Sequence, residues 1–102
     1  MVTYETEKDK LILFLAGEVD HHRAGRMREE MEQYVEQFGC QHLVLDFSRV
    51  TFMDSSGIGL ALSQYKKMRA AGSTMEIRGA RGYTRRIFEL AGIPAMIPFT
   101  DA

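Results

Sequence analysis

The sequence predicts an α/β fold: a single domain whose mixed, mostly parallel sheet follows the order β-β-α-β-α-β-α-β and opens with an antiparallel hairpin. The chain has 102 residues, which is close to the commonest size of one domain. After two adjacent apolar segments, short apolar runs alternate with segments of helical periodicity, an order that gives parallel strands with right-handed crossovers. No linker, repeat or low-complexity segment interrupts this order, so residues 1–102 are expected to form one unit.

The opening hairpin is predicted by two segments that a short polar turn separates. Apolar and polar residues alternate over 2–6, a pattern typical of an edge strand. The turn covers 8–10, and residues 11–17 then form an unbroken apolar run, as expected of a strand in the middle of a sheet. An edge strand is thus followed by a central one.

The first crossover helix and the next buried strand follow the hairpin. Apolar or small residues recur every three or four positions from Asp20 to Phe38, which predicts a helix that Asp20 caps and Gly39 ends. The stripe consists of Ala24, Met27, Met31, Val35 and Phe38. Residues 43–47 are predicted to form a buried strand, and residues 48–51 connect it to a turn that contains two serines.

A second helix is expected after the serines, and Gly72 should end it because glycine readily adopts the backbone conformation of a helix end. The residues predicted to face inward are Ile58, Leu62, Tyr65 and Met68. Residues 74–78 then read as a shorter strand, because apolar and polar side chains alternate there.

The last helix and a weak edge strand complete the predicted order. Thr84 should cap this helix, which ends before Gly92. Its apolar residues are Ile87, Phe88 and Leu90. Residues 96–97 are expected to form the edge strand, and Pro98 limits it because proline has no N–H to donate to a sheet.

Two loops are expected to share one edge of this sheet. In open parallel sheets, binding sites gather at the carboxyl ends of the strands. The segments 17–22 and 53–57 both match that description. We therefore expect Asp20 and its histidine neighbours to lie beside Ser55 and to form part of the same surface.

The stretch Phe52-Met53-Asp54-Ser55-Ser56-Gly57-Ile58-Gly59 places two serines where an apolar strand gives way to a helix. Unpaired backbone N–H groups at a helix N-terminus attract an anion, a phosphate or the oxygen of a reacting hydroxyl. Asp54 or Ser55 can equally be a plain N-cap, because aspartate and serine are preferred at that position. Spacing alone leaves both interpretations open.

Catalytic motifs that would use these residues are incomplete. An esterase that uses Ser55 is poorly supported, because no histidine follows His42 to act as its base. Gly57-x-Gly59 lacks the full dinucleotide-binding spacing, and no Gly-Lys-Ser/Thr follows it as a phosphate-binding loop requires. The sequence therefore predicts a protein that is not an enzyme and that needs no cofactor.

Metal ligands are not indicated either. The adjacent residues Asp20, His21 and His22 diverge around a helix and lack the His-x-x-x-His spacing, and Cys40 with His42 lacks two further ligands. The methionines at 27, 31, 68 and 75 have core spacing. Met53, in its loop, is instead expected to be an exposed and adaptable contact.

Charge and composition limit the expected partners and compartment. The formal net charge of −1 produces no strong field, so neither nucleic acid nor an acidic membrane is an expected partner. Cys40 is the single cysteine and cannot form an internal disulfide. No signal-peptide pattern opens the sequence, and no segment approaches the apolar length that spans a bilayer. The sequence predicts a cytoplasmic protein.

The whole chain resembles the sporulation-type anti-sigma factor antagonists, or anti-anti-sigma factors, of the STAS domain family. The resemblance rests on Gly17-Glu18-Val19-Asp20-His21-His22, on residues 52–59, on Tyr65-Lys66 and on Arg86-Ile87-Phe88-Glu89-Leu90-Ala91-Gly92-Ile93. These segments occur in the order typical of the family and cover nearly the full length.

The resemblance implies a role for the serine turn. In this family, the serine directly after the loop aspartate is phosphorylated by an anti-sigma factor that is an ATP-dependent serine kinase. That serine is Ser55 here, and Ser56 is the less favoured acceptor. A PP2C-type phosphatase removes the phosphate, and the unphosphorylated form captures the anti-sigma factor and frees a sigma factor. The expected partner-binding residues are Asp20, His21, His22, Met53, Asp54, Ser56, Gly57, Ile58 and Gly59.

Two further expectations follow from the resemblance. The alternative function is a STAS signalling module that binds a nucleotide or another small anion at the same helix N-terminus. The family usually continues into a C-terminal helix, whereas this sequence stops at Phe99-Thr100-Asp101-Ala102. An absent helix would leave apolar surface uncovered, which favours self-association.

Overall fold

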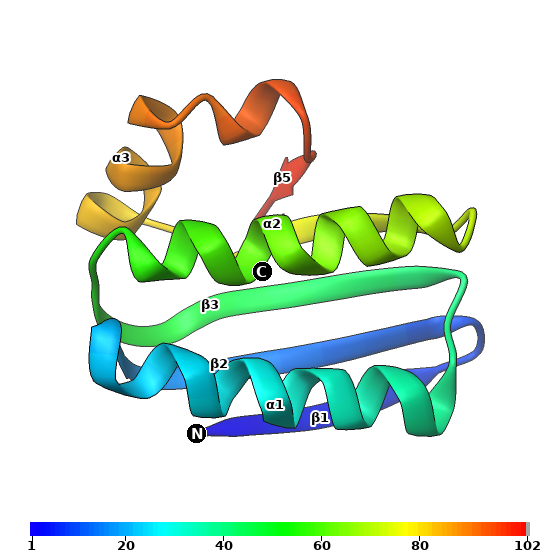
Figure 1. Ribbon diagram of the computed structural model, residues 1–102. Coiled ribbons are helices and arrows are strands. Elements are labelled where there is room, and N and C mark those ends of the chain that lie inside the picture. Colours follow the sequence, from blue (N-terminus) through cyan, green and yellow to red (C-terminus); the bar gives the residue numbers. More distant parts are fainter. Residues whose placement is uncertain (102) are drawn as a thin grey trace.

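The sheet has five strands, and they follow one another across it in chain order, β1-β2-β3-β4-β5 (Figure 1). The computed structural model describes residues 1–101. Its elements are β1 (Val2–Glu7), β2 (Lys10–Val19), α1 (His21–Phe38), β3 (His42–Met53), α2 (Ser56–Ala70), β4 (Thr74–Arg78), α3 (Gly82–Leu90), the short 3-10 helix η1 (Ile93–Ala95) and β5 (Phe99–Thr100). The predicted order of strands and α-helices is confirmed.

Strand pairing explains why the helices lie on one side. β1 pairs with β2 in antiparallel fashion, and the pairs β2-β3, β3-β4 and β4-β5 are parallel. Each parallel pair is joined by a crossover that advances in the same direction across the sheet. Right-handed crossovers that advance in one direction all lie on one face. Figure 1 accordingly shows α1 and α2 together in front of the strands.

The main core lies between the helices and this face of the sheet. Leu45 of β3, Met31 of α1 and Leu60 of α2 are fully shielded from solvent and belong to one apolar cluster. The ring of Phe88 in α3 meets that of Phe47 in β3 edge to face, with 5.1 Å between centroids. All three helices are therefore anchored in one core.

The opposite face of the sheet, which we call the helix-free face, holds a second and smaller buried cluster. This cluster consists of strand residues only, namely Ile12, Phe14 and Val44. Every buried apolar residue of a helix within residues 1–101 belongs instead to the main core. Strand side chains on the helix-free face must therefore shield one another.

β3 is longer than the predicted strand over 43–47, because it covers His42–Met53. Its register with β2 shifts between Phe14 and Ala16 and again between Gly17 and Glu18. Such bulges let a strand bend and continue through residues that break the alternation of apolar and polar side chains. β3 therefore runs directly into the serine turn.

α2 packs through a different stripe from the predicted one. Its buried residues are Gly57, Leu60, Ala61, Gln64 and Met68. Ile58, Leu62 and Tyr65, which were expected to face inward, are only partly buried at the margin of the core. The prediction followed the large apolar side chains, whereas small residues let this helix approach the sheet closely. Gln64 is fully buried, and neither polar atom of its amide has a hydrogen-bond partner.

α3 begins after Arg81, so the prediction that Thr84 caps it is wrong. Thr84 lies inside the helix and is buried. Phe88 faces the core as predicted, but Leu90, two positions further around the helix, has 74% of its surface exposed. A nine-residue helix at the edge of the sheet has one buried stripe and cannot bury both residues.

The last strand lies after Pro98 rather than over 96–97. The backbone N–H groups of Met96 and Ile97 both donate to the Ile93 carbonyl, which commits them to the turn of η1. The Pro98 carbonyl instead accepts from the N–H of Ile77 in β4 at 2.9 Å. Proline thus sits where only its carbonyl joins the sheet, and β5 follows it.

Candidate functional site

The two predicted loops meet where β2 and β3 end. Val19 and Met53, the last residues of these parallel strands, are register partners. The N–H of Asp54 donates to the Val19 carbonyl oxygen over 3.2 Å. α1 and α2 therefore begin as neighbours at one end of the sheet, on the left in Figure 1. The prediction that the loops adjoin is confirmed.

The Asp54 carboxylate links the two loops. Its Oδ1 accepts a hydrogen bond from the backbone N–H of Ser56 at 2.8 Å. The backbone and charge of His21, at the start of α1, also favour the ionised form of this carboxylate. The backbone and side chain of Ser56, and then the backbone and charge of His21, hold the pKa of Asp54 below its ordinary value against partial desolvation. The ionised Asp54 side chain thus caps the first turn of α2 and is stabilised by the start of α1.

The two serines of the turn have different surroundings. Ser55 is the N-cap residue of α2, with φ −62° and ψ −14°, and its side chain makes no capping hydrogen bond. Ser55 is exposed, whereas Ser56 is half-buried and its backbone N–H is the group bonded to the Asp54 carboxylate. Because Asp54 performs the capping, the Ser55 hydroxyl stays free at the surface. An approaching protein can therefore reach Ser55.

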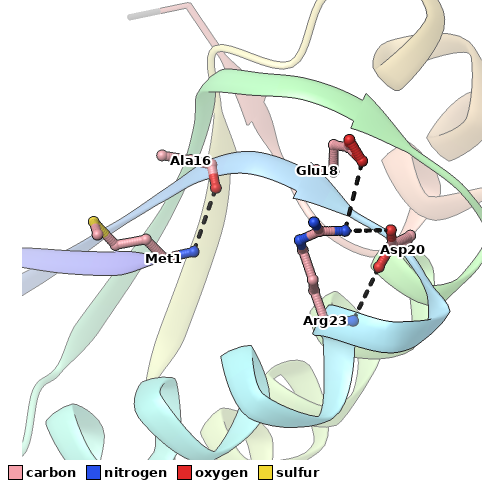
Figure 2. Close-up of polar contacts among 5 residues, drawn as sticks. All are labelled: Met1, Ala16, Glu18, Asp20 and Arg23. Carbon is pink, nitrogen blue, oxygen red and sulfur yellow. Dashed lines mark hydrogen bonds and ion pairs between the residues drawn. The ribbon is translucent and has the colours of Figure 1, made fainter.

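Arg23 holds the other loop in place, as Figure 2 shows. The Arg23 backbone N–H donates to Asp20 Oδ1 at 2.9 Å. Asp20 is therefore the N-cap of α1, as predicted. The Arg23 guanidinium lies 2.6 Å from Asp20 Oδ2 and 3.5 Å from Glu18 Oε1. In the same view, the amino group of Met1 donates to the Ala16 carbonyl at 3.4 Å. These contacts fix the loop relative to β2.

A histidine stands beside each carboxylate of the site. His21 and His22 are both exposed in the first turn of α1, with 6.0 Å between ring centroids. The charge of His21 acts on Asp54, and that of His22 acts on Asp20. Partial desolvation raises the pKa of Asp20, but hydrogen bonds and charge from Arg23, together with His22, bring that pKa below its ordinary value.

The structure gives no support for a metal centre. Within residues 1–101, no three His, Cys, Asp or Glu side chains come together in a way that could hold a metal ion. Both ring nitrogens of His42 are engaged, Nδ1 with Thr74 Oγ1 at 2.7 Å and Nε2 with Glu76 Oε1 at 2.6 Å. Burial raises the pKa of the Cys40 thiol.

Two of the expected partner-binding residues lie in the interior. Met53 is completely buried, so the prediction of an exposed contact is wrong. Gly57 is buried as well, and a Cβ added there would overlap Met53 Sδ and lie 2.6 Å from Met53 Cγ. The pair fixes how closely α2 approaches the end of β3. Ile58 and Gly59 are half-buried and remain accessible in part.

Phe52 was not selected from the sequence, although its side chain is 46% exposed beside the serine turn. Its register partner is Glu18, which contacts Arg23 in the neighbouring loop. Side chains alternate along a strand, so the burial of Met53 directs Phe52 outward. The alternation of side chains along the strand could have identified Phe52 from the sequence. It was missed because Met53 was expected to be the exposed residue.

The protein is a small α/β domain whose helices cover one face of the sheet. At the carboxyl edge of that sheet, two adjoining loops present the exposed serine Ser55, an arrangement typical of a binding domain. The chain belongs to the STAS domain family, whose model matches residues 1–102. None of the three α-helices in residues 1–101 has both the length and the apolar composition that crossing a membrane requires.

Two relatives define the branch of the family that this chain resembles. The anti-sigma F factor antagonist of Paenibacillus polymyxa is 31% identical over 100 residues, which cover 98% of this chain and 86% of the relative. The anti-sigma-B factor antagonist of Listeria monocytogenes is 31% identical over 93 residues, which cover 91% of this chain and 81% of the relative. Both are named as regulatory antagonists rather than enzymes.

Solved structures show the same fold. The anti-sigma factor antagonist SpoIIAA in its unphosphorylated form matches with a TM-score of 0.83 and 25% identity, over 100% of this chain and 88% of that one. Bacillus SpoIIAA in the phosphorylated form matches with a TM-score of 0.76 and 25% identity, over 100% and 91% of the two chains.

Proposed function

We propose that this protein is an anti-sigma factor antagonist that phosphorylation of Ser55 switches off. The unphosphorylated form binds an anti-sigma factor that is also a serine kinase, and the bound anti-sigma factor releases its sigma factor. Phosphorylation prevents this binding, and a PP2C-type phosphatase restores it. The protein acts on transcription in the cytoplasm. A role in sporulation stays a prediction from the sequence resemblance.

The relatives support the general function. Antagonists of the anti-sigma F and anti-sigma-B factors are each about a third identical to this chain over nearly its whole length. The fold also matches SpoIIAA in both an unphosphorylated and a phosphorylated form. A domain of this architecture therefore accepts a phosphate without a change of fold.

The observation that carries the proposal is the different placement of the two serines. Ser55 is exposed and its side chain makes no capping hydrogen bond, while Ser56 is half-buried and its backbone N–H donates to Asp54. A kinase needs a hydroxyl that it can reach and that no internal hydrogen bond restrains. Ser55 meets this requirement on a loop that Asp54 and the start of α1 hold in place.

The switch follows from charge at a fitted surface. A phosphoryl group on Ser55 adds roughly −1.5 to −2 charges beside Asp54, together with bulk and a large desolvation cost. A partner surface that packs against the neutral hydroxyl therefore loses that contact and is repelled when Ser55 is phosphorylated. The N-terminus of α2 stabilises negative charge, so the phosphate does not oppose the fold.

The proposal is tested with the kinase itself. The immobilised protein should capture an anti-sigma factor kinase from the native cytosol, and this kinase should transfer radiolabelled phosphate from ATP to the chain. We expect labelling of the wild type and of the matched control Ser56→Ala, and none of Ser55→Ala. Circular dichroism checks that all three are folded. Labelling that survives in Ser55→Ala and disappears in Ser56→Ala would contradict the assignment.

A further inference from the structure

The helix-free face carries two guanidinium groups around one aromatic ring. The Arg49 guanidinium carbon lies 4.4 Å from the centre of the Phe14 ring, and that of Arg78 lies 5.6 Å from it. Phe14 is only 8% exposed although it belongs to the cluster that no helix residue joins. The two arginine side chains therefore cover this ring from the side that faces solvent.

Arg78 is held in place by a buried acid. Its Nε lies 2.7 Å from Oδ2 of Asp46, which is 2% exposed. The other carboxylate oxygen of Asp46 accepts hydrogen bonds from the backbone N–H and the hydroxyl of Ser48, at 2.8 and 2.6 Å. Asp46 is therefore fully satisfied within the protein. This ion pair holds the Arg78 guanidinium beside the ring of Phe14.

Arg49 has donors and no acceptor for them. It is exposed, and in the part of the chain that the structure describes it forms no ion pair and no side-chain hydrogen bond. Its contact with Phe14 nevertheless holds the guanidinium over the ring. A preoriented and unsatisfied guanidinium loses little side-chain entropy when an anion binds to it.

We propose that Arg49, Arg78 and Phe14 form a docking site for an acidic peptide segment of a protein partner. A glutamate or aspartate carboxylate fits the planar donor fork of Arg49 in bidentate fashion, and the neighbouring charge of Arg78 reinforces the contact. The apolar ring beneath strengthens this attraction, because it keeps water from one side of the guanidinium groups.

The surrounding charges restrict the partner to a short acidic segment. Glu5 is the register partner of Ile12, and Glu76 is that of Val44, so both acids share the helix-free face with Phe14. A long polyanion such as a nucleic-acid strand would have to pass over these carboxylates. One or two carboxylates of a peptide reach the arginines without doing so.

This surface is separate from the serine turn and does not depend on Ser55 phosphorylation. The protein can therefore contact a partner with its helix-free face while the loops at the carboxyl edge are occupied. The proposal stands or falls on the arginines alone, because its test uses no kinase and no anti-sigma factor.

The test measures binding of a fluorescein-labelled hexaglutamate peptide by fluorescence polarisation at low salt. We expect Arg49→Gln to weaken binding about tenfold, because a charge-assisted contact is lost. Arg28→Gln is the matched control, since it removes the same charge from an exposed position on α1, on the other side of the sheet, and should leave affinity unchanged. Phe14→Leu keeps the position apolar and should weaken binding severalfold.

Three results would overturn the proposal. The wild type would show no binding to hexaglutamate, or the Arg28 and Arg49 variants would lose affinity equally, which indicates general charge attraction. In the third case, hexathymidylate would bind as well as the peptide and with the same dependence on Arg49, so that the surface recognises nucleic acid. Amide shifts of Phe14, Arg49 and Arg78 in a titration followed by NMR locate the peptide independently.

Discussion

Two glycines in the first turn of α2 give a matched pair of substitutions with opposite expected effects on stability. At Gly57, a new methyl group would overlap Met53 Sδ and lie 2.6 Å from Met53 Cγ. At Gly59, apart from the adjoining residues and the nearby backbone of α2 itself, no atom lies within 4 Å of the position that the methyl group would take. The same chemical change is therefore made against a buried side chain at one position and into open space at the other.

The magnitudes follow from two competing terms. Replacing glycine by alanine within a helix stabilises it by about 0.5–1 kcal/mol. Forcing extra volume into a filled core costs about 1–3 kcal/mol, and Met53 is completely buried, so it has little room to move. Gly57→Ala should lower the free energy of unfolding by about 1 kcal/mol, and Gly59→Ala should raise it by about 0.5–1 kcal/mol. The two melting temperatures should differ by about 10 °C.

Urea unfolding monitored by circular dichroism measures both effects, with equal slopes taken as a check that the unfolded states are comparable. A Met53→Ala background provides the decisive control, because it removes the side chain that the new methyl group overlaps. In that background, Gly57→Ala should become neutral or stabilising. If Gly57→Ala costs the same free energy with and without Met53, the packing of α2 against the end of β3 is not the cause and the reasoning fails.

Three further outcomes are expected. Gln64→Met should raise the free energy of unfolding by about 1–3 kcal/mol, since it replaces one buried amide whose two polar atoms have no partners, and a lower melting temperature would refute this. Partial burial raises the pKa of Glu76, but hydrogen bonds from Thr100 and His42 outweigh this and lower that pKa from 4.5. Glu76 therefore stabilises the fold above pH 4.5 and less so as the pH falls through its folded pKa. Glu76→Gln should have a lower free energy of unfolding than the wild type at neutral pH, and this difference should disappear in acid. A difference that does not change with pH would contradict this. Ser55→Asp should weaken binding to the anti-sigma factor less than phosphorylation does, because it adds a smaller charge; calorimetry that finds both forms bound as tightly as the wild type would exclude charge and bulk as the mechanism.

The elements that were predicted correctly are those in which apolar residues recur with a regular period. The helix from Asp20 to Phe38 and the strand over 74–78 show their periodicity directly, and the structure confirms both. The predicted strand was shorter than β3, because the bulges of β3 break the alternation of side chains on which the prediction depends. β5 has only two residues, so its place depends on hydrogen bonds to β4 that no local pattern reveals.

The candidate site was predicted in its location but not in its detail. The topology brought the two loops together, since parallel neighbours end at one edge of the sheet. The burial of Met53 could not be read from its place beside a turn, because it depends on the contact with Gly57. The contrast between Ser55 and Ser56 arises from the orientation of the Asp54 carboxylate, which adjacent positions in a sequence do not specify.

The strand order β1-β2-β3-β4-β5 has a consequence for what this edge can recognise. In open α/β sheets, the crevice that receives a small ligand opens where the strand order reverses and successive helices leave on opposite faces. This sheet has no such reversal, and α1 and α2 begin beside each other where β2 and β3 end. The edge that carries Ser55 consequently lacks the switch point at which such crevices form. This absence suits the protein partner that we propose, because an added phosphoryl group would then meet the partner's surface directly.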